Sequence, residues 1–358
     1  MSEHIESSRS TALMGDLKAL LAHVARGRSL SESEAAAAFD IIMSGHATPS
    51  QMGGFLMALR VRGETVDEIT GAARTMRAKA LRIEAPPGTI DTCGTGGDSS
   101  GSFNISTASA LVVAGCGVPV AKHGNRALSS QSGSADVLTA LGVNIDADIG
   151  VVHQCLWEIG LGFLMAPRHH SATRHVAPAR VELGTRTIFN LLGPLSSPAM
   201  ARRQLVGVFA PEWVRPMAEV LGRLGAEHAW VVHGDGLDEL TTAGVTRVAE
   251  YKDGKVDAFD VAPEDFGLPR TPLEEIRGGE PQHNARLMRD LLAGNGGALR
   301  NVVLLNSGAA LLVAGRAANV EAGIELAARS IDSGAARRVL EELVVRTNTP
   351  ASAEVAAR

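Results

Sequence analysis

The stretch that decides the fold lies at residues 91–98 and reads Asp91-Thr-Cys-Gly-Thr-Gly-Gly-Asp98. A short β-branched run at Thr89–Thr92 predicts a strand leading into it, and Asn104-Ile-Ser-Thr107 begins the next helix. The glycines allow unusual backbone dihedrals and a close approach to a ligand. Successive N–H groups of such a loop, together with a helix N-terminus, favour an anion. The stretch therefore predicts a strand–loop–helix unit that binds phosphate.

Two other phosphate loops are excluded by the surrounding residues. No Gly-Lys-Ser/Thr follows at the Walker spacing, and Ser99 stands where a dinucleotide fingerprint has its third glycine. A plain tight turn is the alternative for a glycine cluster. The Ser, Thr and Asn residues of 99–107 favour phosphate binding, because their hydroxyl and amide groups can bond to phosphate oxygens.

Beyond this loop, short apolar runs alternate with helical stretches. The predicted strands are Thr89–Thr92, Val118–Ala121, Gly162–Met165, Leu205–Phe209, Trp230–Val232 and Val302–Leu305. Such alternation is typical of an α/β domain with a largely parallel sheet. We place this domain at residues 86–358.

Residues 1–85 predict a separate helical domain. Three helix starts carry capping-box spacing, at Ser31 with Glu34, Thr48 with Gln51, and Thr65 with Glu68. Ala85-Pro-Pro-Gly88 ends the helical pattern, and residues 1–10 read as a solvated tail. A helix-like stretch at Val181–Leu192 predicts a return to the helical domain, near residues 172–195.

Composition excludes several classes of function. The 358 residues are 45% hydrophobic and carry a net charge of −5, whereas nucleic-acid and membrane-surface proteins usually have an excess of Lys and Arg. Aromatic residues make up 3%, too few for stacking platforms. Three cysteines favour free thiols in a reducing compartment, and neither a signal core nor a membrane-length apolar run is visible. We expect a soluble cytoplasmic protein.

A second segment, Lys122–Ser130, follows the predicted strand Val118–Ala121, and Gln131–Asp136 comes after it. Ligands bind in α/β sheets at this end of a strand. Lys, Arg, hydroxyl and backbone N–H groups suit a pyrophosphate. A solvated basic turn is the alternative.

A third segment, Val232–Glu239, also follows a strand. The adjacent carboxylates of Asp238 and Glu239 can hold Mg²⁺ when phosphates of a substrate complete its ligands. An exposed acidic turn is the alternative.

A fourth segment runs from Phe163 to Pro194. His169, His170 and His175 lack the spacing that would bring three zinc ligands to one helical face. Arg180 lies near the junction of the two domains, where clefts form, and could pair with a substrate carboxylate. An ordinary surface arginine is the alternative.

Together these segments resemble the anthranilate phosphoribosyltransferase family. The resemblance covers nearly the whole chain and rests on CGTGGD, NIST, KHGNR, SGSADVL, ELGTRTIFNLLGP and DGLDE in this order. It implies a small all-helical domain joined to a large α/β domain with a mostly parallel central sheet, similar to pyrimidine nucleoside phosphorylases. It also implies transfer of the phosphoribosyl group of phosphoribosyl pyrophosphate (PRPP) to the amine of anthranilate, with release of pyrophosphate, in tryptophan biosynthesis.

The resemblance further implies the site residues. Those expected to bind PRPP are Gly94, Gly97, Asp98, Ser102, Asn104, Ile105, Ser106, Thr107, Lys122, His123, Gly124, Asn125, Arg126, Ala127, Leu128, Ser129, Ser130 and Ser134. Those expected to bind anthranilate are Gly94, His123, Asn125, His170, Arg180 and Pro194. Two Mg²⁺ ions are expected with PRPP, at Ser106, Asp238 and Glu239.

No general base is assigned, and Lys122 and His123 are candidates for charge stabilisation. Ser102 replaces a common Thr of the family and keeps the hydroxyl group. Ser171 and Thr173 replace common Pro and Met, so the resemblance does not give the detailed shape of the anthranilate channel near them. The family habit is a homodimer formed through the helical domains.

Two alternative functions fit the same fold. A nucleoside phosphorylase would bind a nucleoside and inorganic phosphate, and a non-catalytic relative would bind nucleic acid. Asp238, Glu239 and Arg180 favour PRPP over the first alternative, and the charge of −5 disfavours the second.

Overall fold

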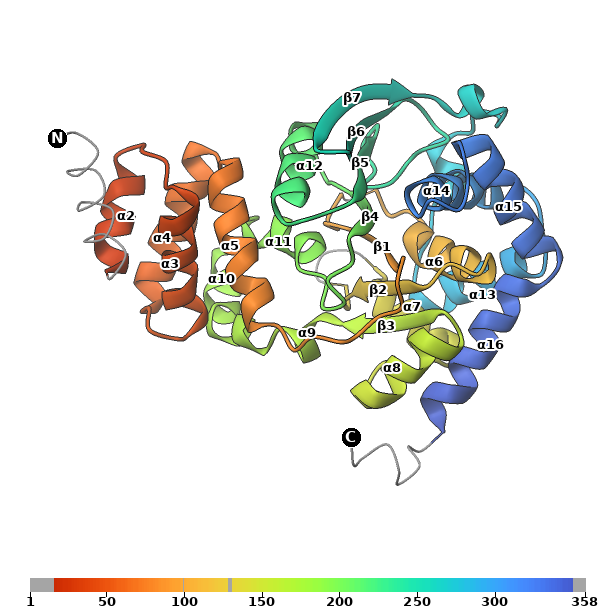
Figure 1. The fold of residues 1–358 in the computed structure, drawn as a ribbon, viewed down its shortest axis with the longest axis horizontal. Helices are drawn as coiled ribbons and strands as arrows, with labels where there is room; N and C mark the ends of the chain where they lie inside the picture. Colours follow the sequence, from red (N-terminus) through yellow and green to blue (C-terminus); the bar gives the residue numbers. More distant parts are fainter. Residues whose placement is uncertain (1–15, 99, 128–130, 350–358) are drawn as a thin grey trace.

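The computed structural model describes residues 16–98, 100–127 and 131–349. The tail predicted at residues 1–10 lies outside the described residues. A helical bundle stands at one end of the molecule and an α/β unit forms the rest (Figure 1). The bundle contains α2 (Leu17–Ala25), α3 (Glu32–Met43), α4 (Pro49–Arg62) and α5 (Val66–Lys79).

Three helices of the bundle begin at the predicted capping boxes. The side chains of Ser31, Thr48 and Thr65 each accept a hydrogen bond from the backbone N–H three residues later. The Glu or Gln at that later position accepts in return from the N-cap N–H, so the box is reciprocal in all three helices. Pro49 occupies the first turn of α4, where no backbone donor is needed. The three capping predictions are confirmed.

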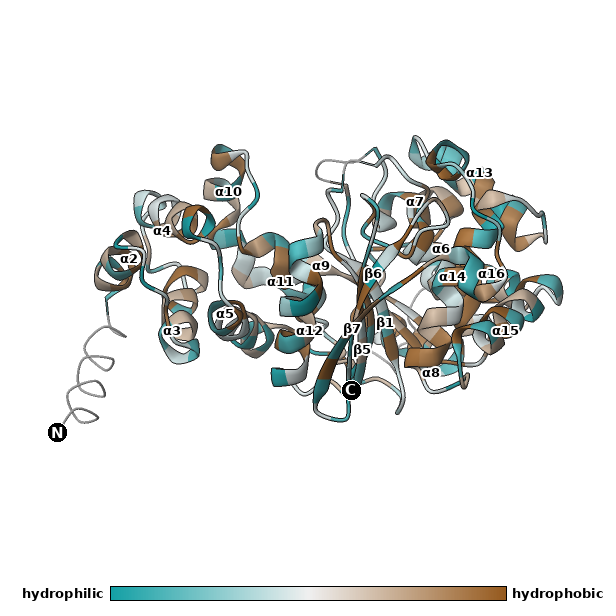
Figure 2. Ribbon diagram, turned by 90° about the horizontal axis from the view of Figure 1, so that it is seen from above, coloured by the Kyte–Doolittle hydropathy of each residue, from teal (hydrophilic) through white to brown (hydrophobic). Residues whose placement is uncertain are grey.

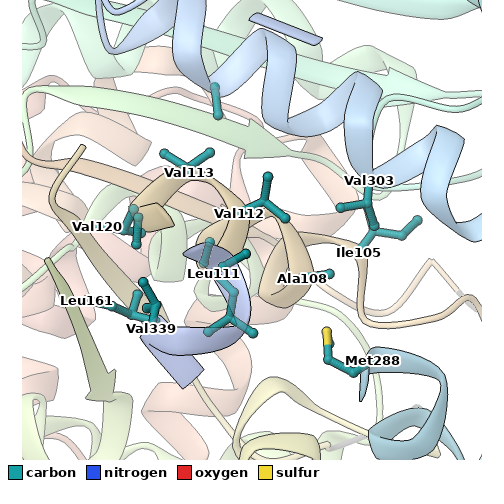
Figure 3. Packing of buried hydrophobic residues seen from close by; sticks show 14 of the residues in the cluster. Ile105, Ala108, Leu111, Val112, Val113, Val120, Leu161, Met288, Val303 and Val339 are labelled. Carbon is teal, nitrogen blue, oxygen red and sulfur yellow. The ribbon is translucent and has the colours of Figure 1, made fainter. Parts of the chain in front are cut away.

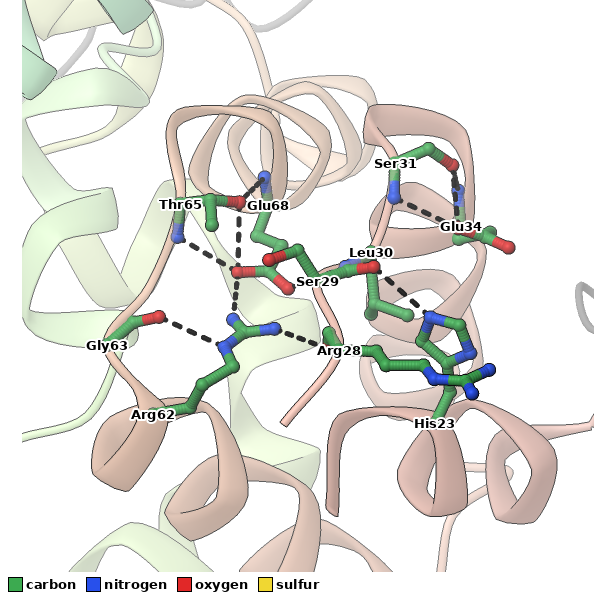
Figure 4. Close-up of polar contacts among 10 residues, drawn as sticks. All are labelled: His23, Arg28, Ser29, Leu30, Ser31, Glu34, Arg62, Gly63, Thr65 and Glu68. Carbon is green, nitrogen blue, oxygen red and sulfur yellow. Dashed lines mark hydrogen bonds and ion pairs between the residues drawn. The ribbon is translucent and has the colours of Figure 1, made fainter. Parts of the chain in front are cut away.

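One buried carboxylate links three of these helices (Figure 4). Glu68 on α5 accepts from the backbone N–H of Leu30 at 2.8 Å, just before α3, and forms an ion pair with Arg62 at the end of α4. Arg62 also donates to the carbonyl of Arg28 at 2.6 Å. Removing Arg62 would leave a buried charge without its partner, which typically costs about 3–5 kcal/mol.

A later segment returns to this bundle. Helices α10 (Ala177–Leu183) and α11 (Phe189–Leu195) pack against α4 and α5, and the Phe189 ring lies 5.5 Å from that of Phe39. The predicted helical stretch at 181–192 is broken in the structure, because Gly184 ends α10 in the left-handed region at φ 58°.

The α/β unit is built on a seven-stranded sheet. Its order is β3-β2-β1-β4-β5-β6-β7, and the pairs from β3 through β5 are parallel. The strands are β1 (Ile90–Gly94), β2 (Val120–Gly124), β3 (Leu161–Met165), β4 (Arg203–Gly207), β5 (His228–Gly234), β6 (Thr246–Lys252) and β7 (Lys255–Val261). Five of the predicted strands correspond to β1–β5, and the mostly parallel sheet is confirmed.

One predicted strand is wrong and two strands were missed. Val302–Leu305 belongs to helix α14 (Ala298–Val313), which is buried along most of its length. A short apolar run looks the same in a buried helix and in a buried strand, which explains the error. The missed strands β6 and β7 form an antiparallel hairpin at one side of the sheet, and most residues of β7 are exposed. Asp253-Gly254 at the turn was the available hairpin signal.

Helices cover both faces of the sheet. They include α6 (Ile105–Gly115), α7 (Ser134–Leu141), α8 (Ile149–Glu158), α9 (Ala166–His169), α12 (Val214–Arg223), α13 (Pro281–Leu292), α15 (Val320–Asp332) and α16 (Ala335–Asn348). Alternate residues of β5 face opposite layers, and Trp230 and Val232 join the apolar cluster of α6, α14 and α16. Figure 3 shows part of this cluster, including Leu111, Val303 and Val339. Ala229 and Val231 join the cluster shared with α12 and the helical bundle.

The central strands are largely hydrophobic in Figure 2, as expected for a parallel sheet covered on both faces. No helix in the described part of the chain has the length and apolar content needed to cross a membrane.

Candidate active site

The predicted loops meet at one edge of the sheet. Strands β1, β2 and β5 end at Gly94, Gly124 and Gly234, and each is followed by one of the segments selected from sequence. β1 is parallel to β2 and to β4, and β4 is parallel to β5. The carboxyl ends of β1, β2 and β5 therefore lie along the same edge of the sheet, across the strand ends. This edge is where open α/β sheets bind ligands.

The glycine loop contacts the acidic loop closely. The Gly96 N–H donates to Asp238 Oδ2 at 2.7 Å, and the Asp238 N–H donates to Asp98 Oδ2 at 3.2 Å. A Cβ at Gly94 would lie 2.5 Å from Asp238 Oδ2, so this position has no room for a side chain. Gly96 and Gly97 have φ of 67° and 74°, a region that other residues rarely adopt.

The acid pair also reaches helix α6. Glu239 Oε1 accepts from the Ser106 N–H at 3.1 Å, in the first turn of α6. Burial raises the pKa of Asp238 to about 7, and the nearby Asp98 carboxylate adds to that shift. Burial and Asp238 raise the pKa of Glu239 to about 8. Burial and mutual repulsion thus disfavour the ionised carboxylates, and a cation bound there would favour them.

The donor set at this cluster fits Mg²⁺. Carboxylate and hydroxyl oxygens of Asp238, Glu239 and Ser106 are hard ligands of the kind that this ion prefers. Among residues 16–98, 100–127 and 131–349, no three His, Cys, Asp or Glu side chains are grouped so that they alone could hold a metal. An ion here would need oxygens from a substrate and from water, as Mg²⁺ commonly does with phosphates.

Lys122 lies beneath this cluster. Its side chain is buried, and Nζ donates to the Thr92 carbonyl at 2.6 Å and to Ser106 Oγ at 3.1 Å. Burial lowers the pKa of Lys122, and the charges of Asp91 and Glu239 oppose that shift. The ammonium group thus orients the Ser106 hydroxyl and supplies positive charge from below the loop.

Two neutral imidazoles stand beside the loops. The rings of His123, at the end of β2, and His170, after α9, are 5.1 Å apart at their centroids. Burial lowers the pKa of His123 to about 3, and the charge of His170 adds to that shift. Burial and His169 lower the pKa of His170 to about 4. Within the described residues, His123 Nε2 and both ring nitrogens of His170 have no hydrogen-bond partner. Buried polar atoms of this kind are expected to bind a ligand or water.

Known proteins share both the sequence and this architecture. Residues 18–80 match the model of a glycosyl transferase family helical bundle domain, and residues 86–337 match that family's a/b domain. The anthranilate phosphoribosyltransferase of Azospirillum brasilense is 65% identical over 335 residues, which cover 93% of this chain and 94% of that protein.

Two solved structures are similar over nearly the whole chain. Anthranilate phosphoribosyltransferase from Thermus thermophilus has a TM-score of 0.88 at 46% identity, covering 92% of this chain and 99% of that one. The Saccharomyces cerevisiae enzyme in complex with PRPP and Mg has a TM-score of 0.82 at 28% identity, with coverages of 95% and 98%.

The chain belongs to the anthranilate phosphoribosyltransferase family. The family and enzyme class predicted from sequence, a pentosyl-transferring glycosyltransferase, are confirmed.

Most residues predicted for PRPP in this phosphoribosyltransferase lie around the same sheet edge. Asn104 precedes α6 and donates to the Ser132 carbonyl at 3.0 Å, so the first and second segments are in contact. Ser134 Oγ donates to the Asn125 carbonyl at 3.3 Å, and the Arg126 guanidinium pairs with Asp136 at 3.2 Å. Leu128, Ser129 and Ser130 lie outside the described residues.

The other predicted PRPP residues also follow the first two strands. Gly97 and Asp98 lie in the glycine loop, and the backbone of Ser102 forms an isolated antiparallel β-bridge with that of Arg277. Ile105 and Thr107 are buried in the first turn of α6. Gly124 ends β2, where a Cβ would lie 2.3 Å from Ser134 Oγ, and Ala127 donates its N–H to Asp136 Oδ2 at 2.8 Å.

The predicted acceptor residues are more widely spread. Arg180 lies on α10, half-buried, with its guanidinium 5.3 Å from the centre of the Phe189 ring, and burial lowers its pKa. Pro194 lies within α11, where its carbonyl accepts from Gln204 Nε2 at 2.9 Å. In the described part of the chain, no hydrogen bond or ion pair joins Arg180 to the loops, so its role in binding anthranilate stays a prediction.

Several contacts of the phosphoribosyltransferase site were not predicted from the sequence. Asn284 Nδ2, from α13, donates to Asn104 Oδ1 at 2.9 Å, although the two residues are 180 positions apart. Asp136 Oδ2 accepts from the backbone of Ala127 at 2.8 Å and of Gly133 at 3.0 Å, which closes the second loop. Arg186 donates to the Gly97 carbonyl. It lies in the ELGTRTIFNLLGP motif, which was the signal that could have suggested it.

Proposed function

We propose that this chain transfers the 5-phosphoribosyl group of PRPP to the amine of anthranilate, giving N-(5-phosphoribosyl)anthranilate and pyrophosphate in tryptophan biosynthesis. The observation that carries the proposal is the meeting of an anion-binding loop, an acidic cluster and a pair of buried imidazoles with unpartnered ring nitrogens at one end of the sheet. The first two suit a metal-bound pyrophosphate, and the third suits the neutral amine of an aromatic acceptor. Membership of the family supports the same reaction.

The donor would bind across the glycine loop and the start of α6. Backbone N–H groups of 94–98 and the positive end of the α6 dipole attract phosphate oxygens. Asn104 makes no side-chain cap hydrogen bond to α6, because its amide is engaged with Ser132 and Asn284. Ser106 and Thr107 add hydroxyl groups in the first turn.

Asp238, Glu239 and Ser106 would hold Mg²⁺ together with the donor. Bound Mg²⁺ would neutralise the negative charge that develops on the departing pyrophosphate. The nearby Asp98 carboxylate adds to the repulsion within this acid pair, which a bound cation would relieve. The family resemblance implies two ions. Lys122 would support this charge balance from beneath by orienting the Ser106 hydroxyl.

The acceptor would lie beside His123 and His170. During transfer, the anthranilate nitrogen bonds to ribose C1, the bond from C1 to the pyrophosphate oxygen breaks, and the nitrogen releases one proton. The amine is neutral and nucleophilic near pH 7, so orientation and stabilisation of the leaving group carry most of the acceleration. Neutral His123 can accept a hydrogen bond from the amine, and the released proton passes to solvent. Arg180 and Asn125 are proposed to orient the acceptor.

A fluorescence assay tests this function. Anthranilate should lose its fluorescence only when the protein, PRPP and Mg²⁺ are all present, and pyrophosphate should appear in equal amount. Parallel reactions with pyrimidine nucleosides and inorganic phosphate test the phosphorylase alternative. Turnover of nucleosides without turnover of anthranilate would reject the proposal.

We also propose a homodimer formed through the helical bundle, with residues 1–85 and 172–195 as one domain and 86–358 as the other. Val61 on α4 and Val181 on α10 are 81% and 80% exposed, on helices that pack against each other. Such apolar exposure suits a protein interface. Val61→Glu with Val181→Glu should convert a dimer to a monomer in light scattering, and a monomeric wild type would reject this proposal.

Cys93, Cys116 and Cys155 form no disulfide, which supports a reducing cytoplasmic location.

A further inference from the structure

Arg186 makes a contact that the proposed mechanism does not yet use. It lies between α10 and α11, in the segment that returns to the helical bundle. Its guanidinium donates to the Gly97 carbonyl and stands 4.2 Å from the centre of the Phe209 ring. A planar guanidinium is suited to this combination of hydrogen bond and stacking, which a lysine could not reproduce.

Phe209 belongs to the same support of the glycine loop. Its backbone N–H donates to Thr95 Oγ1 at 2.9 Å, and the Thr95 N–H donates to the Gly207 carbonyl at 2.9 Å. The start of the loop is thus fixed by β4 and the residues after it. Gly96 is fixed by Asp238, and Arg186 holds the last glycine, Gly97.

The Gly97 carbonyl is an effective point at which to fix the loop. Gly96 and Gly97 have no side chains, and each can adopt many backbone conformations. The peptide bond after Gly97 is planar and trans, so its carbonyl and the Asp98 N–H point in opposite directions. Holding the carbonyl toward Arg186 therefore also sets the direction of the Asp98 N–H, and with it one donor of the anion-binding loop.

The same segment reaches the acceptor side. Phe189 follows Arg186 by three residues, packs against Phe39 of the bundle and lies under the Arg180 guanidinium. A short run of chain therefore connects the donor loop to the helix that carries Arg180.

We infer that Arg186 is a positioning residue that orders the PRPP loop and couples donor binding to acceptor binding. This inference rests on the proposed function. It assigns to Arg186 no contact with either substrate. Its loss should weaken PRPP binding and reduce the effect of PRPP on anthranilate affinity, with a smaller effect on kcat.

The test compares Arg186→Gln and Arg186→Lys with the wild type. Calorimetry measures the Kd of PRPP with Mg²⁺, and anthranilate affinity is measured with and without PRPP and Mg²⁺. Arg82→Gln, an exposed arginine in the linker after α5, is the matched control. Arg186→Gln should weaken PRPP about tenfold or more, the loss expected for one charge-assisted hydrogen bond. Arg186→Lys should fall between Gln and wild type, since it keeps a donor but loses the planar contact.

The coupling between PRPP binding and anthranilate binding is tested separately. The ratio of anthranilate affinities with and without PRPP should move toward one in Arg186→Gln. Unchanged PRPP affinity in a variant that melts at the wild-type temperature would overturn the inference. So would equal losses in all kinetic parameters together with a lower melting temperature, because that pattern indicates a structural arginine. If Arg186→Gln does not fold, the PRPP affinities of Arg186→Lys and Phe209→Leu are compared with that of the wild type instead. Affinities equal to wild type in both variants would overturn the inference.

A wrong proposed function would give a different result from a wrong role of Arg186. In that case the wild type would neither bind PRPP nor consume anthranilate. A wild type that does both, with Arg186 variants that match it, overturns only the role of Arg186.

Discussion

A single methyl group at Gly94 tests whether the acidic loop holds a metal for catalysis. A Cβ built at this position lies 2.5 Å from Asp238 Oδ2 and 3.1 Å from its Cγ. Ordinary contact begins at 3.4 Å, so the carboxylate must retreat by about 0.9 Å. That movement disrupts the 2.7 Å hydrogen bond from the Gly96 N–H. The Gly94 backbone itself has no positive φ, so the change acts on the carboxylate rather than through backbone strain.

The expected cost follows from that hydrogen bond. A bond to a charged group contributes about 1.5–3 kcal/mol, which corresponds to roughly a 10- to 150-fold change in an equilibrium constant. We therefore expect Gly94→Ala to raise the Mg²⁺ concentration needed for half-maximal turnover by about that factor. Gly94 is also predicted to contact both substrates, so the metal titration is made at saturating PRPP and anthranilate.

The assay is a titration of initial rate against Mg²⁺ for wild type, Gly94→Ala and Gly53→Ala. Gly53 lies in α4 with open space around its Cβ, so its alanine variant is the control for an added methyl group. Gly96→Val provides a contrast, because Gly96 has open space but a φ of 67°. It should weaken PRPP binding through loop distortion more than it reduces stability. An unchanged Mg²⁺ requirement in Gly94→Ala would refute the reasoning.

Three other changes test separate parts of the site. Asp238→Asn with Glu239→Gln should abolish Mg²⁺-dependent turnover while the circular dichroism spectrum stays native, and undiminished turnover would remove the metal assignment. Arg180→Ala should raise the KM for anthranilate roughly 10- to 150-fold and leave the KM for PRPP nearly unchanged; equal losses for both substrates would indicate a structural arginine. Because burial depresses the pKa values of His123 and His170 to about 3 and 4, the unfolded chain binds protons first as pH falls below about 6.5. These histidines therefore contribute stability that is present above pH 6.5 and is lost at up to about 1.4 kcal/mol per pH unit for each on acidification. Urea unfolding at several pH values should show that the free energy of unfolding falls less on acidification in His170→Asn than in the wild type. The same dependence on pH in both proteins would contradict the lowered pKa of His170.

Local signals in the sequence were sufficient to predict where helices α3, α4 and α5 of the bundle begin. A capping box is formed by residues three positions apart, so Thr48 and Gln51 could be paired without knowledge of the rest of the fold. Val302–Leu305 was different, because its apolar residues are buried by neighbours from other parts of the chain. The sequence does not show whether such a run is buried as a helix or as a strand.

The same distinction applies to the site. Glycines 94, 96 and 97 and the acids Asp238 and Glu239 could be predicted because each loop carries its chemistry in adjacent positions. Their contact across 142 residues, from Gly96 to Asp238, followed from the parallel sheet once the strands were known. The pairing of His123 with His170 depends on side-chain packing between separate elements, and no sequence periodicity predicts it.

The support of the glycine loop by Arg186 also depends on tertiary structure. The motif drew attention to the segment, but only the return of α10 and α11 to the bundle brings its guanidinium to Gly97. Propensity and spacing describe the segment itself and do not describe which carbonyl it will reach.

The most direct test of the proposed function is product identification. The protein is incubated with anthranilate, PRPP and Mg²⁺, and the products are separated and weighed by mass spectrometry. We expect N-(5-phosphoribosyl)anthranilate and pyrophosphate in equal amounts, with neither formed when Mg²⁺ is removed by a chelator or when Asp238→Asn with Glu239→Gln replaces the wild type. Formation of the product at an unchanged rate under those two conditions, or its absence with the folded wild type and all reactants present, would contradict the proposed function.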